Sequence, residues 1–303
     1  MLRSILAVVV IAAVSVRAEW PLSMNDYDDH DPVTSGKLVA WVGSDGTDAE
    51  IMLWNGKKTI PLTNNDVFDG YVAVGGKYVV WVDSLDLSAD ISEIFLWDGA
   101  YLLPGVPKAI NISNTGATAM CATPHTDGKN VVWSQDNGNG FEIMLWDGKT
   151  VTQLTNNDYD DTDPKVRNGR VVWSGYADGP DGEIFYWDGD SVIRLTDNNQ
   201  ADYDQVIDDD LVAWKGGTAG RGTDVYLYDG VAITNLSIGI AIGNVGSLSI
   251  SKACIAWTEA SPIYYQVYLW EQGNVQTLTM GDDDNIDVAN YGNRVAWLDD
   301  NFD

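Results

Sequence analysis

Residues Asp163 to Trp173 read Asp-Pro-Lys-Val-Arg-Asn-Gly-Arg-Val-Val-Trp. The last three residues of this segment belong to a pattern that recurs along the chain and indicates the architecture. Two β-branched or small residues followed by Trp occur seven times, at Trp41, Trp81, Trp133, Trp173, Trp214, Trp257 and Trp297. The successive spacings are 40, 52, 40, 41, 43 and 40 residues. A fixed period of this length in strand-forming residues is typical of a stacked or radial repeat.

Each repeat divides into four short strands. In the fourth repeat these begin at Asp163, Arg170, Glu183 and Ser191, and Asn168-Gly169 and Asp188-Gly189 supply two of the turns. A second aromatic series marks the third strand, 13 to 16 residues after the first, at Trp54, Trp97, Trp146, Trp187, Tyr228 and Trp270. Short strands joined by Asn-Gly and Asp-Gly turns are hairpin signals, and no helical period competes with them. Four strands in about 40 residues predict one blade of an all-β propeller.

The same residues resemble the repeat of the TolB-like, WD40-like β-propeller family. The likeness lies in an Asp-Pro pair, a Gly turn, an apolar-apolar-aromatic strand, a loop, and the strand Glu183-Ile184-Phe185. It covers nearly all of the chain after the first 18 residues and implies a propeller fold. The family's usual Ser-Pro-Asp-Gly turn is absent, and we see no TolB-type N-terminal domain before the blades, so no role in envelope translocation is carried over. Propellers host many functions, and the resemblance implies none in particular.

We expect one propeller domain over residues 19–303, with seven four-stranded blades of which the last is incomplete. The seventh repeat supplies two strands, from about Asp287 to Asp299, and a segment at about 20–25 resembles a fourth strand and is expected to close that blade. One strand is then missing. Three readings stay open: a fragment, an irregular blade, or a strand donated by another copy, which would make a polymer-forming surface protein.

Composition and the N-terminus indicate an exported, acidic protein. Residues 1–18 have a charged start, an apolar run from Ile5 to Val14 and a small-x-small site, which predicts a signal peptide. We therefore expect a secreted, periplasmic or cell-surface location. The 45 acidic and 17 basic residues give a net charge of −28, which disfavours nucleic acid and anionic lipid as partners. No later segment is long enough to span a membrane.

The two cysteines, Cys121 and Cys254, could form a disulfide in an exported chain. They fall in the third and sixth repeats at different positions of the repeat, so the phasing argues against that bond.

The most distinctive polar signal is an Asp-rich loop between successive repeats. Aligned on the first Trp series, two positions recur, and their carboxylates would surround one mouth of a central channel. Clustered oxygen ligands of this kind suit Ca²⁺, so we predict a cation site there. The competing interpretation is that these residues form Asx-turns and begin the strands. The predicted ligands are Asp29, Asp31, Asp161, Asp163, Asp202, Asp204 and Asp287.

The loops between second and third strands are also rich in Gly and Asp, for example Ser44–Asp48, Asp136–Gly140 and Asp178–Gly182. We interpret them as plain hairpin loops, with ligand binding as the alternative. The Trp residues of the first series are predicted to be core. Tyr176 and Tyr264-Tyr265 are the better candidates for stacking on a carbohydrate.

No catalytic constellation stands out. The chain has two histidines, His30 and His125, and lacks a Gly-x-Ser-x-Gly elbow, a phosphate-binding Gly loop and a His/Cys metal cluster. We therefore predict a binding or assembly module with a protein or carbohydrate partner and Ca²⁺ as its one candidate cofactor. The alternative is a hydrolase or lyase that uses carboxylates at the channel mouth. The repeat is broken after Gly99, where extra residues are inserted, and in the sixth repeat, which lacks the Asp residues.

Overall fold

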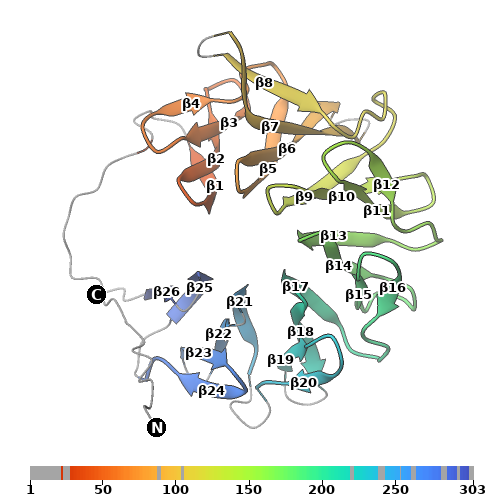
Figure 1. The fold of residues 1–303 in the computed structure, drawn as a ribbon, viewed down its shortest axis with the longest axis vertical. Coiled ribbons are helices and arrows are strands. Elements are labelled where there is room, and N and C mark those ends of the chain that lie inside the picture. Colours follow the sequence, from red (N-terminus) through yellow and green to blue (C-terminus); the bar gives the residue numbers. More distant parts are fainter. Residues whose placement is uncertain are drawn as a thin grey trace. The chain divides into compact units, whose positions relative to one another are not determined.

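The computed structural model describes residues 22, 28–86, 90–103, 106–218, 222–237, 243–252, 254–260, 264–280, 285–291 and 294–299. All regular structure in this part of the chain is β (Figure 1). Six sheets have four antiparallel strands in sequence order and a seventh has two. We call each sheet a blade. No helix long and apolar enough to cross a membrane occurs in these ranges.

The strands divide between two compact units, which are described separately. The N-terminal unit (Glu19–Gly179 and Phe185–Arg194) holds blades one to three and nearly all of blade four. Blade one contains β1 (Asp29–Ser35), β2 (Leu38–Ser44), β3 (Ala49–Trp54) and β4 (Thr59–Pro61). Blade two contains β5 (Phe68–Gly75), β6 (Tyr78–Asp86), β7 (Ile91–Leu103) and β8 (Val106–Asn111). Blade three contains β9 (Cys121–Thr126), β10 (Val131–Asp136), β11 (Phe141–Trp146) and β12 (Val151–Gln153). Blade four contains β13 (Asp161–Arg167), β14 (Arg170–Gly175), β15 (Glu183–Trp187) and β16 (Val192–Arg194).

The C-terminal unit includes Pro180–Ile184 and Leu195–Asp303 and holds the remaining blades. Blade five contains β17 (Asp202–Asp208), β18 (Leu211–Thr218), β19 (Gly222–Tyr228) and β20 (Ile233–Asn235). Blade six contains β21 (Val245–Ser251), β22 (Cys254–Ala260), β23 (Tyr265–Glu271) and β24 (Asn274–Thr277). Blade seven contains β25 (Asn285–Tyr291) and β26 (Arg294–Asp299). The predicted strands of each repeat are confirmed, and the two strands of the seventh are the ones expected.

Two predicted segments lie almost wholly outside the described residues: the signal peptide at 1–18 and the closing strand at about 20–25. Leu22 is the described exception, and its carbonyl oxygen accepts a 2.6 Å hydrogen bond from the Thr59 hydroxyl. Both predictions stay predictions. Cys121 and Cys254 are buried free thiols, as the phasing of the repeat suggested.

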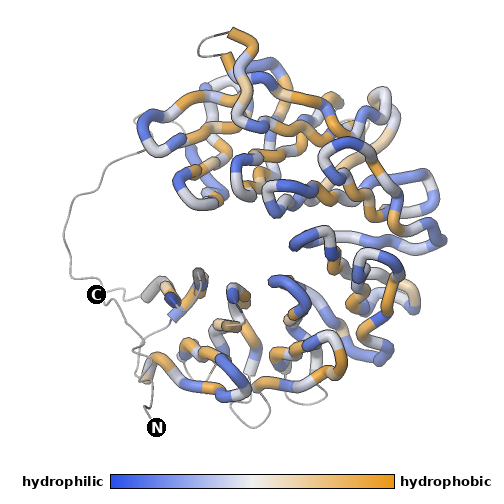
Figure 2. The backbone as a smooth tube through the Cα atoms, viewed as in Figure 1, coloured by the Kyte–Doolittle hydropathy of each residue, from blue (hydrophilic) through white to orange (hydrophobic). Residues whose placement is uncertain are grey.

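The first Trp series forms the core, as predicted, because it packs one blade on the next. Six of its members are at most 4 % exposed, namely Trp41, Trp81, Trp133, Trp173, Trp214 and Trp257. Trp81 of blade two packs with Ala40 and Leu53 of blade one, and Trp173 of blade four packs with Ile143 of blade three. Each blade therefore buries its apolar face against a neighbour, with hydrophobic stretches along the strands and polar residues at most turns (Figure 2).

Candidate metal centre

The predicted ligands Asp31, Asp163, Asp204 and Asp287 share one backbone conformation. Each lies at a β-bulge in the first strand of its blade, with φ between 51° and 53°. Asp is among the few non-glycine residues that adopt this left-handed conformation readily, which explains why it recurs there. Two of these carboxylates already have cationic partners: Lys165 Nζ lies 2.5 Å from Asp163, and Lys215 Nζ lies 2.6 Å from Asp204.

The predicted ligands Asp29, Asp161 and Asp202 hold the core Trp residues in place. The indole Nε1 of Trp173 donates a 2.8 Å hydrogen bond to Asp161 Oδ1, and Asn157 Nδ2 donates a 2.7 Å bond to Asp161 Oδ2. The Trp214–Asp202 pair has the same arrangement, and Trp41 donates to Asp29 at 2.8 Å. We call this arrangement the Asp–Trp clamp. It gives these three residues a structural role that accounts for their periodicity.

A glycine opposite the Asp makes room for the clamp. Asp161 is paired in register with Gly175, and a Cβ atom on Gly175 would lie 2.6 Å from Asp161 Oδ1. Gly43 and Gly216 take the same place beside Asp29 and Asp202, with a 2.5 Å approach in each case. A side chain at this position would therefore displace the carboxylate from the indole.

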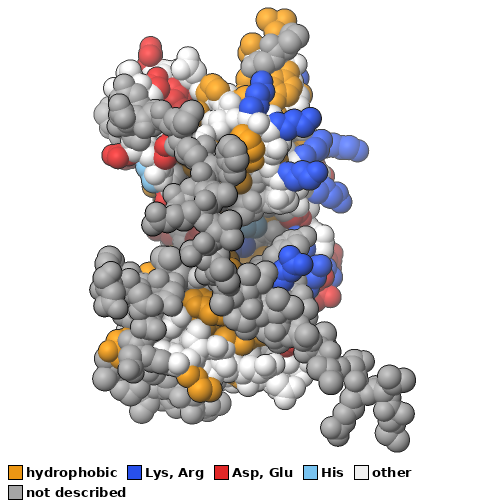
Figure 3. Space-filling model, turned by 90° about the vertical axis from the view of Figure 1, so that its left-hand side faces the viewer, with side chains coloured by type: hydrophobic (Ala, Val, Ile, Leu, Met, Phe, Trp, Pro, Cys, Tyr) orange, Lys and Arg blue, Asp and Glu red, His pale blue; other side chains and the backbone are white. Residues whose placement is uncertain are grey.

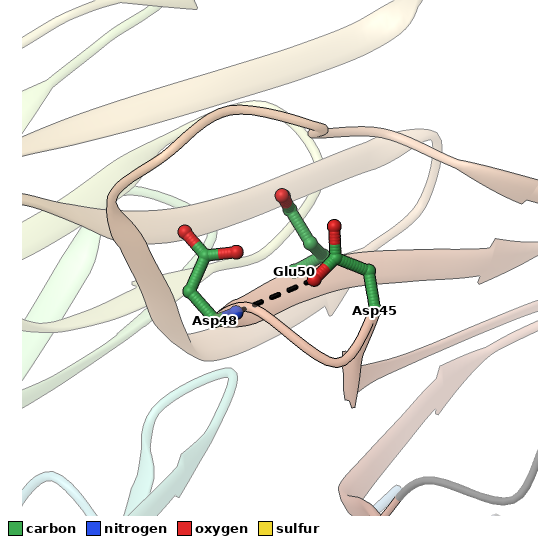
Figure 4. A group of neighbouring side chains, drawn as sticks. All are labelled: Asp45, Asp48 and Glu50. Atoms are coloured by element: carbon green, nitrogen blue, oxygen red, sulfur yellow. Dashed lines mark hydrogen bonds between the residues drawn. The ribbon is translucent and has the colours of Figure 1, made fainter.

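One group of three carboxylates among the described residues brings its oxygens within 4.8 Å of one another, and it consists of Asp45, Asp48 and Glu50. None of the seven predicted ligands belongs to it, and the cation prediction at those seven positions stays a prediction. Asp45 and Asp48 lie in the loop between β2 and β3, and Glu50 is at the start of β3 (Figure 4). This loop was expected to be a plain hairpin.

The loop holds its carboxylates close together through its backbone. Asp45 Oδ1 accepts a 2.7 Å hydrogen bond from the amide of Thr47. It also accepts one from the amide of Asp48, at 3.3 Å (Figure 4). Glu50 is 2 % exposed, and its Oε1 accepts the Asn65 amide at 2.9 Å. Its Oε2 and both carboxylate oxygens of Asp48 are buried and have no hydrogen-bond partner within the described part of the chain. Three oxygens without donors therefore lie in one small loop.

The electrostatics of the group agree with that geometry. Burial raises the pKa of Asp48 above its ordinary value, and the neighbouring Asp45 and Asp66 raise it further. Burial also raises the pKa of Glu50, against the opposing effect of the Thr63 hydroxyl and the Asn65 amide, and Asp48 and Asp45 add to the rise. Both carboxylates are short of positive charge and of donors. A divalent cation would supply what the loop lacks, and hard oxygen ligands suit Ca²⁺.

The acidic region continues into blade two, where the clamp is not formed. Asp83 replaces the glycine and is paired in register with Asp69. Asp69 Oδ1, Asp83 Oδ1 and Trp81 Nε1 are all buried without a hydrogen-bond partner among described residues. Burial, and then the Asp83 charge, raises the pKa of Asp69 to about 8, while burial with Glu50 and Glu93 raises that of Asp83 to about 6. Two carboxylates thus meet where blades one, four and five have one carboxylate facing a glycine.

Trp133 and Trp257 have no Asp in the facing position, and each finds an acceptor two residues along its own strand. Trp133 donates to Gln135 at 3.3 Å, and Trp257 donates to Glu259 at 3.0 Å. Trp81 has a carboxylate at both positions and bonds to neither. The region from Asp45 to Asp83 therefore combines an acidic loop with a clamp in which neither carboxylate bonds to the indole.

The two histidines have different surroundings. His30 is exposed, with Nδ1 3.0 Å from the carboxylate of Asp31. The ring of His125 accepts the Val166 amide at 3.1 Å, and burial lowers the pKa of this histidine to about 3. Its Nδ1 is therefore used as a structural acceptor.

Comparisons with solved structures agree with this architecture. The β-propeller domain of the Trilobed protease from Pyrococcus furiosus matches with a TM-score of 0.61 and 14 % identity, over 90 % of this chain and 89 % of that one. The fold is a β-propeller. Acylaminoacyl peptidase from Pyrococcus horikoshii matches with a TM-score of 0.59 and 15 % identity over 90 % of this chain. A prolyl endopeptidase structure matches with a TM-score of 0.62 and 12 % identity.

These identities show the fold alone. The chain spans 49 % of the acylaminoacyl peptidase and 45 % of the prolyl endopeptidase, about half of each. No family model matches the sequence, and no curated protein matches it. The propeller expected from the repeat and from the TolB-like resemblance is confirmed, and the activity of the peptidases is a property of those proteins.

Proposed function

We propose that the protein is an exported, non-enzymatic propeller that acts as a binding or assembly module and binds Ca²⁺ through Asp45, Asp48 and Glu50. The observation that carries the cation site is the set of buried, donor-free oxygens on Asp48 and Glu50 beside a third carboxylate. Export rests on the sequence of residues 1–18. Loops positioned by a rigid scaffold are the usual place for ligand contacts, and the cation would fix one of them.

Blade three contains the neutral counterpart of this loop, which strengthens the proposal. Asn137 takes the place of Asp45, and its Oδ1 accepts the amide of Asn139 at 2.8 Å, as Asp45 Oδ1 accepts that of Thr47. The Asn137 side-chain amide also donates a 3.0 Å hydrogen bond to Glu142, the counterpart of Glu50. Blade three thus gives Oε1 of its buried glutamate a second, neutral donor, whereas Oε2 of Glu142, like Oε2 of Glu50, is buried without a partner among the described residues. Blade one has the carboxylate of Asp45 in that place, and a bound cation would compensate Glu50 as the Asn137 amide compensates Glu142.

The test is a calcium titration of the chelator-treated protein, followed by thermal unfolding. Extracellular calcium modules bind with Kd values of about 10⁻⁴ to 10⁻³ M, so about 10 mM Ca²⁺ is enough to occupy the site. A ligand at 100 times its Kd stabilises the folded state by about 2.7 kcal/mol, which for a domain of this size raises Tm by roughly 5 °C. We expect a rise of that order, and a smaller one with Mg²⁺.

Asp45→Asn is the sharpest variant because it copies blade three. Without Ca²⁺ we expect it to stabilise the protein by about 1 kcal/mol, since it removes a repulsion and supplies a donor to Glu50. Adding Ca²⁺ should leave the Tm of the Asp45→Asn variant unchanged. Glu142→Gln alters the matching residue of blade three and should keep the full calcium response. The proposal fails if Ca²⁺ leaves the Tm of the parent protein unchanged, or if Asp45→Asn responds as the parent does.

A further inference from the structure

The strands of the N-terminal unit give it two chemically different ends. In each four-stranded blade the first–second and third–fourth turns lie at one end, because the strands are antiparallel and in sequence order. The second–third loops and the connections between blades lie at the opposite end. We call these the turn end and the loop end. Consecutive blades pack side by side, so each end forms a continuous surface across this unit.

The turn end carries an unusual share of the positive charge. Seven of the chain's 17 Lys and Arg residues are exposed lysines in or beside these turns, and none forms an ion pair with a described residue: Lys37, Lys57, Lys58, Lys77, Lys108, Lys129 and Lys149. Lys and Arg side chains gather along one edge in Figure 3, with hydrophobic side chains above them. Several acids at this end are engaged with their own turns, as Asp127 and Asp147 are with backbone amides. The turn end is therefore a cationic surface on an acidic protein.

An apolar projection rises from the same end. The hairpin of β7 and β8 is longer than its counterparts, since β7 has 13 residues where the third strands of blades one and three have six. Its described part exposes Leu102 by 63 % and Leu103 by 66 %, with Tyr101 and Val106 at 40 % and 45 %. This is the insertion that breaks the repeat after Gly99. Adjacent exposed leucines on a protruding hairpin form an apolar contact surface that no described residue of this chain covers.

The loop end has the opposite character. Its loops in the N-terminal unit contain no Lys or Arg in the sequence, whereas Asp28, Asp66, Asp90, Asp158 and Asp160 lie there exposed. It also contains a pocket of about 570 Å³ between blades two and three. Its lining is mainly polar and includes the carboxylates of Asp90 and Asp136, while Ile91, Ala119 and Met120 supply its smaller apolar part.

We propose that the β7–β8 hairpin of one copy docks into this pocket of a second copy, so that the chain self-associates head to tail. The apolar hairpin faces Ile91, Ala119 and Met120, and the lysines around it face the acidic loop end. The pocket volume lies within the range of about 300 to 1,000 Å³ typical of binding pockets, which is room for the leucine side chains. Because the two contact surfaces are different, the contact is heterologous, and each added copy presents a free hairpin or a free pocket to the next copy until a ring closes.

The charges predict an unusual salt dependence. Repulsion between two copies of net charge −28 extends over about 30 Å at 0.01 M salt and is largely screened at 0.1 M, where the Debye length is about 10 Å. The local lysine–aspartate attraction is lost near 1 M salt. Association should therefore be strongest near 0.1 M and weaker at either extreme. A purely hydrophobic contact would strengthen steadily with salt instead.

The test is sedimentation velocity on the full mature chain with two single substitutions. Leu103→Asp disables the hairpin and leaves the pocket intact, whereas Thr118→Arg obstructs the pocket and leaves the hairpin intact. Both residues are exposed, so the fold should tolerate each change. We expect the parent to form a concentration-dependent series of species near 0.1 M salt. Each variant should raise the Kd at least tenfold and sediment as a monomer, since loss of a central apolar anchor has that effect.

Mixing the two variants gives the decisive result. One intact hairpin and one intact pocket remain in the mixture, so a one-to-one dimer that does not grow further is expected. Met280→Asp and Thr152→Arg are the matched controls, at exposed positions that belong to neither the hairpin nor the pocket lining, and should associate as the parent does. A parent that stays monomeric across salt concentrations, or a mixture that stays monomeric while the parent associates, overturns the proposal. Binding of a polyanion such as polyglutamate by a monomeric parent would assign the turn end to a different partner.

A pair of variants with equal charge changes separates contact from net charge. Lys108→Gln and Asn139→Asp each lower the net charge by one, the first within β8 of the hairpin and the second at the loop end. We expect Lys108→Gln to weaken association two- to fivefold and Asn139→Asp to leave it equal or stronger. Equal weakening by both would mean that net charge alone governs assembly.

Discussion

The junction between blades one and two and the junction between blades three and four follow one plan with different charges. Both have a glutamate at the start of a third strand, Glu50 or Glu142, whose Oε1 accepts a loop amide at 2.9 Å. Around it the third–fourth junction has Asn137, a formed clamp on Asp161, and Gly175. The first–second junction has instead Asp45 and Asp48, an unformed clamp on Asp69, and Asp83.

The comparison shows that the propeller scaffold does not require the extra carboxylates of the first–second junction. Blades three and four reach a fully bonded clamp with an amide and a glycine, so the acids of the first–second junction add a cost of burial and repulsion. The sequence has buried carboxylates at the first–second junction and neutral residues at the equivalent positions of the third–fourth junction. This contrast points to a role for the carboxylates other than folding. That inference is why we place the cation site there. Substitutions that exchange the two junctions test it.

The largest effect on stability is expected when the third–fourth junction receives, at Gly175, the acid that the first–second junction has at Asp83. Gly175→Asp would place a Cβ 2.6 Å from Asp161 Oδ1 and 2.7 Å from the ring of Phe185, and would bury a second carboxylate. We expect a loss of about 4 kcal/mol of unfolding free energy, from overpacking and an unpaired buried charge. Urea denaturation measures it. Gly36→Asp has no atom within 4 Å of the added Cβ and should cost only about 1 kcal/mol, from the left-handed backbone at φ 62°, which Asp adopts more readily than most residues. A similar cost at both sites would show that the clamp needs no glycine.

The reverse exchange, Asp83→Gly, is expected to stabilise the protein in a pH-dependent way. Asp69 has a folded pKa of about 8, so between about pH 4 and pH 8 the folded chain holds a proton that the unfolded chain has lost. Stability therefore falls as pH rises through that window. Removing Asp83 eliminates a neighbouring charge and lets Asp69 reach Trp81. We expect a gain of roughly 2 kcal/mol at pH 8 and under about 1 kcal/mol at pH 5.

Denaturation of parent and variant at the two pH values checks this expectation. The pH dependence of the difference is the informative quantity, because a loss of steric crowding alone would give the same gain at both. A gain that does not change with pH would mean that the Asp83 charge does not contribute to the raised pKa of Asp69 beyond the effect of burial. Near-ultraviolet absorbance of Trp81 should also shift when its indole gains an acceptor.

Much of the fold could be predicted because it depends on local patterns. The Val-Val-Trp triplets and the Asn-Gly and Asp-Gly turns set strand positions and core by periodicity alone. The clamp could not be read this way, since Trp173 reaches Asp161 across a strand pair whose register includes a bulge. The carboxylate group at Asp45 was missed for another reason: one Asp- and Gly-rich loop is indistinguishable from an ordinary turn. The signal lies in two pairs of equivalent positions, Asp45 with Asn137 and Asp83 with Gly175, where an acid replaces a neutral residue.

The smallest exchange places an acid in the blade-three loop. Asn137→Asp removes the 3.0 Å hydrogen bond to Glu142 and sets a carboxylate beside it, at an expected cost of about 1 kcal/mol. Calcium should recover less than half of that loss, because the position that corresponds to Asp48 is Gly140. Thermal unfolding with and without Ca²⁺ measures both quantities. A calcium response as large as that of blade one would mean that two carboxylates suffice and that Asp48 is dispensable. Gly140 itself cannot supply the third acid, since its φ is 146° and a Cβ there would lie 3.1 Å from Asp160. The blade-three loop is thus restricted by its own backbone to the neutral arrangement, and blade one alone of the pair has room for three carboxylates.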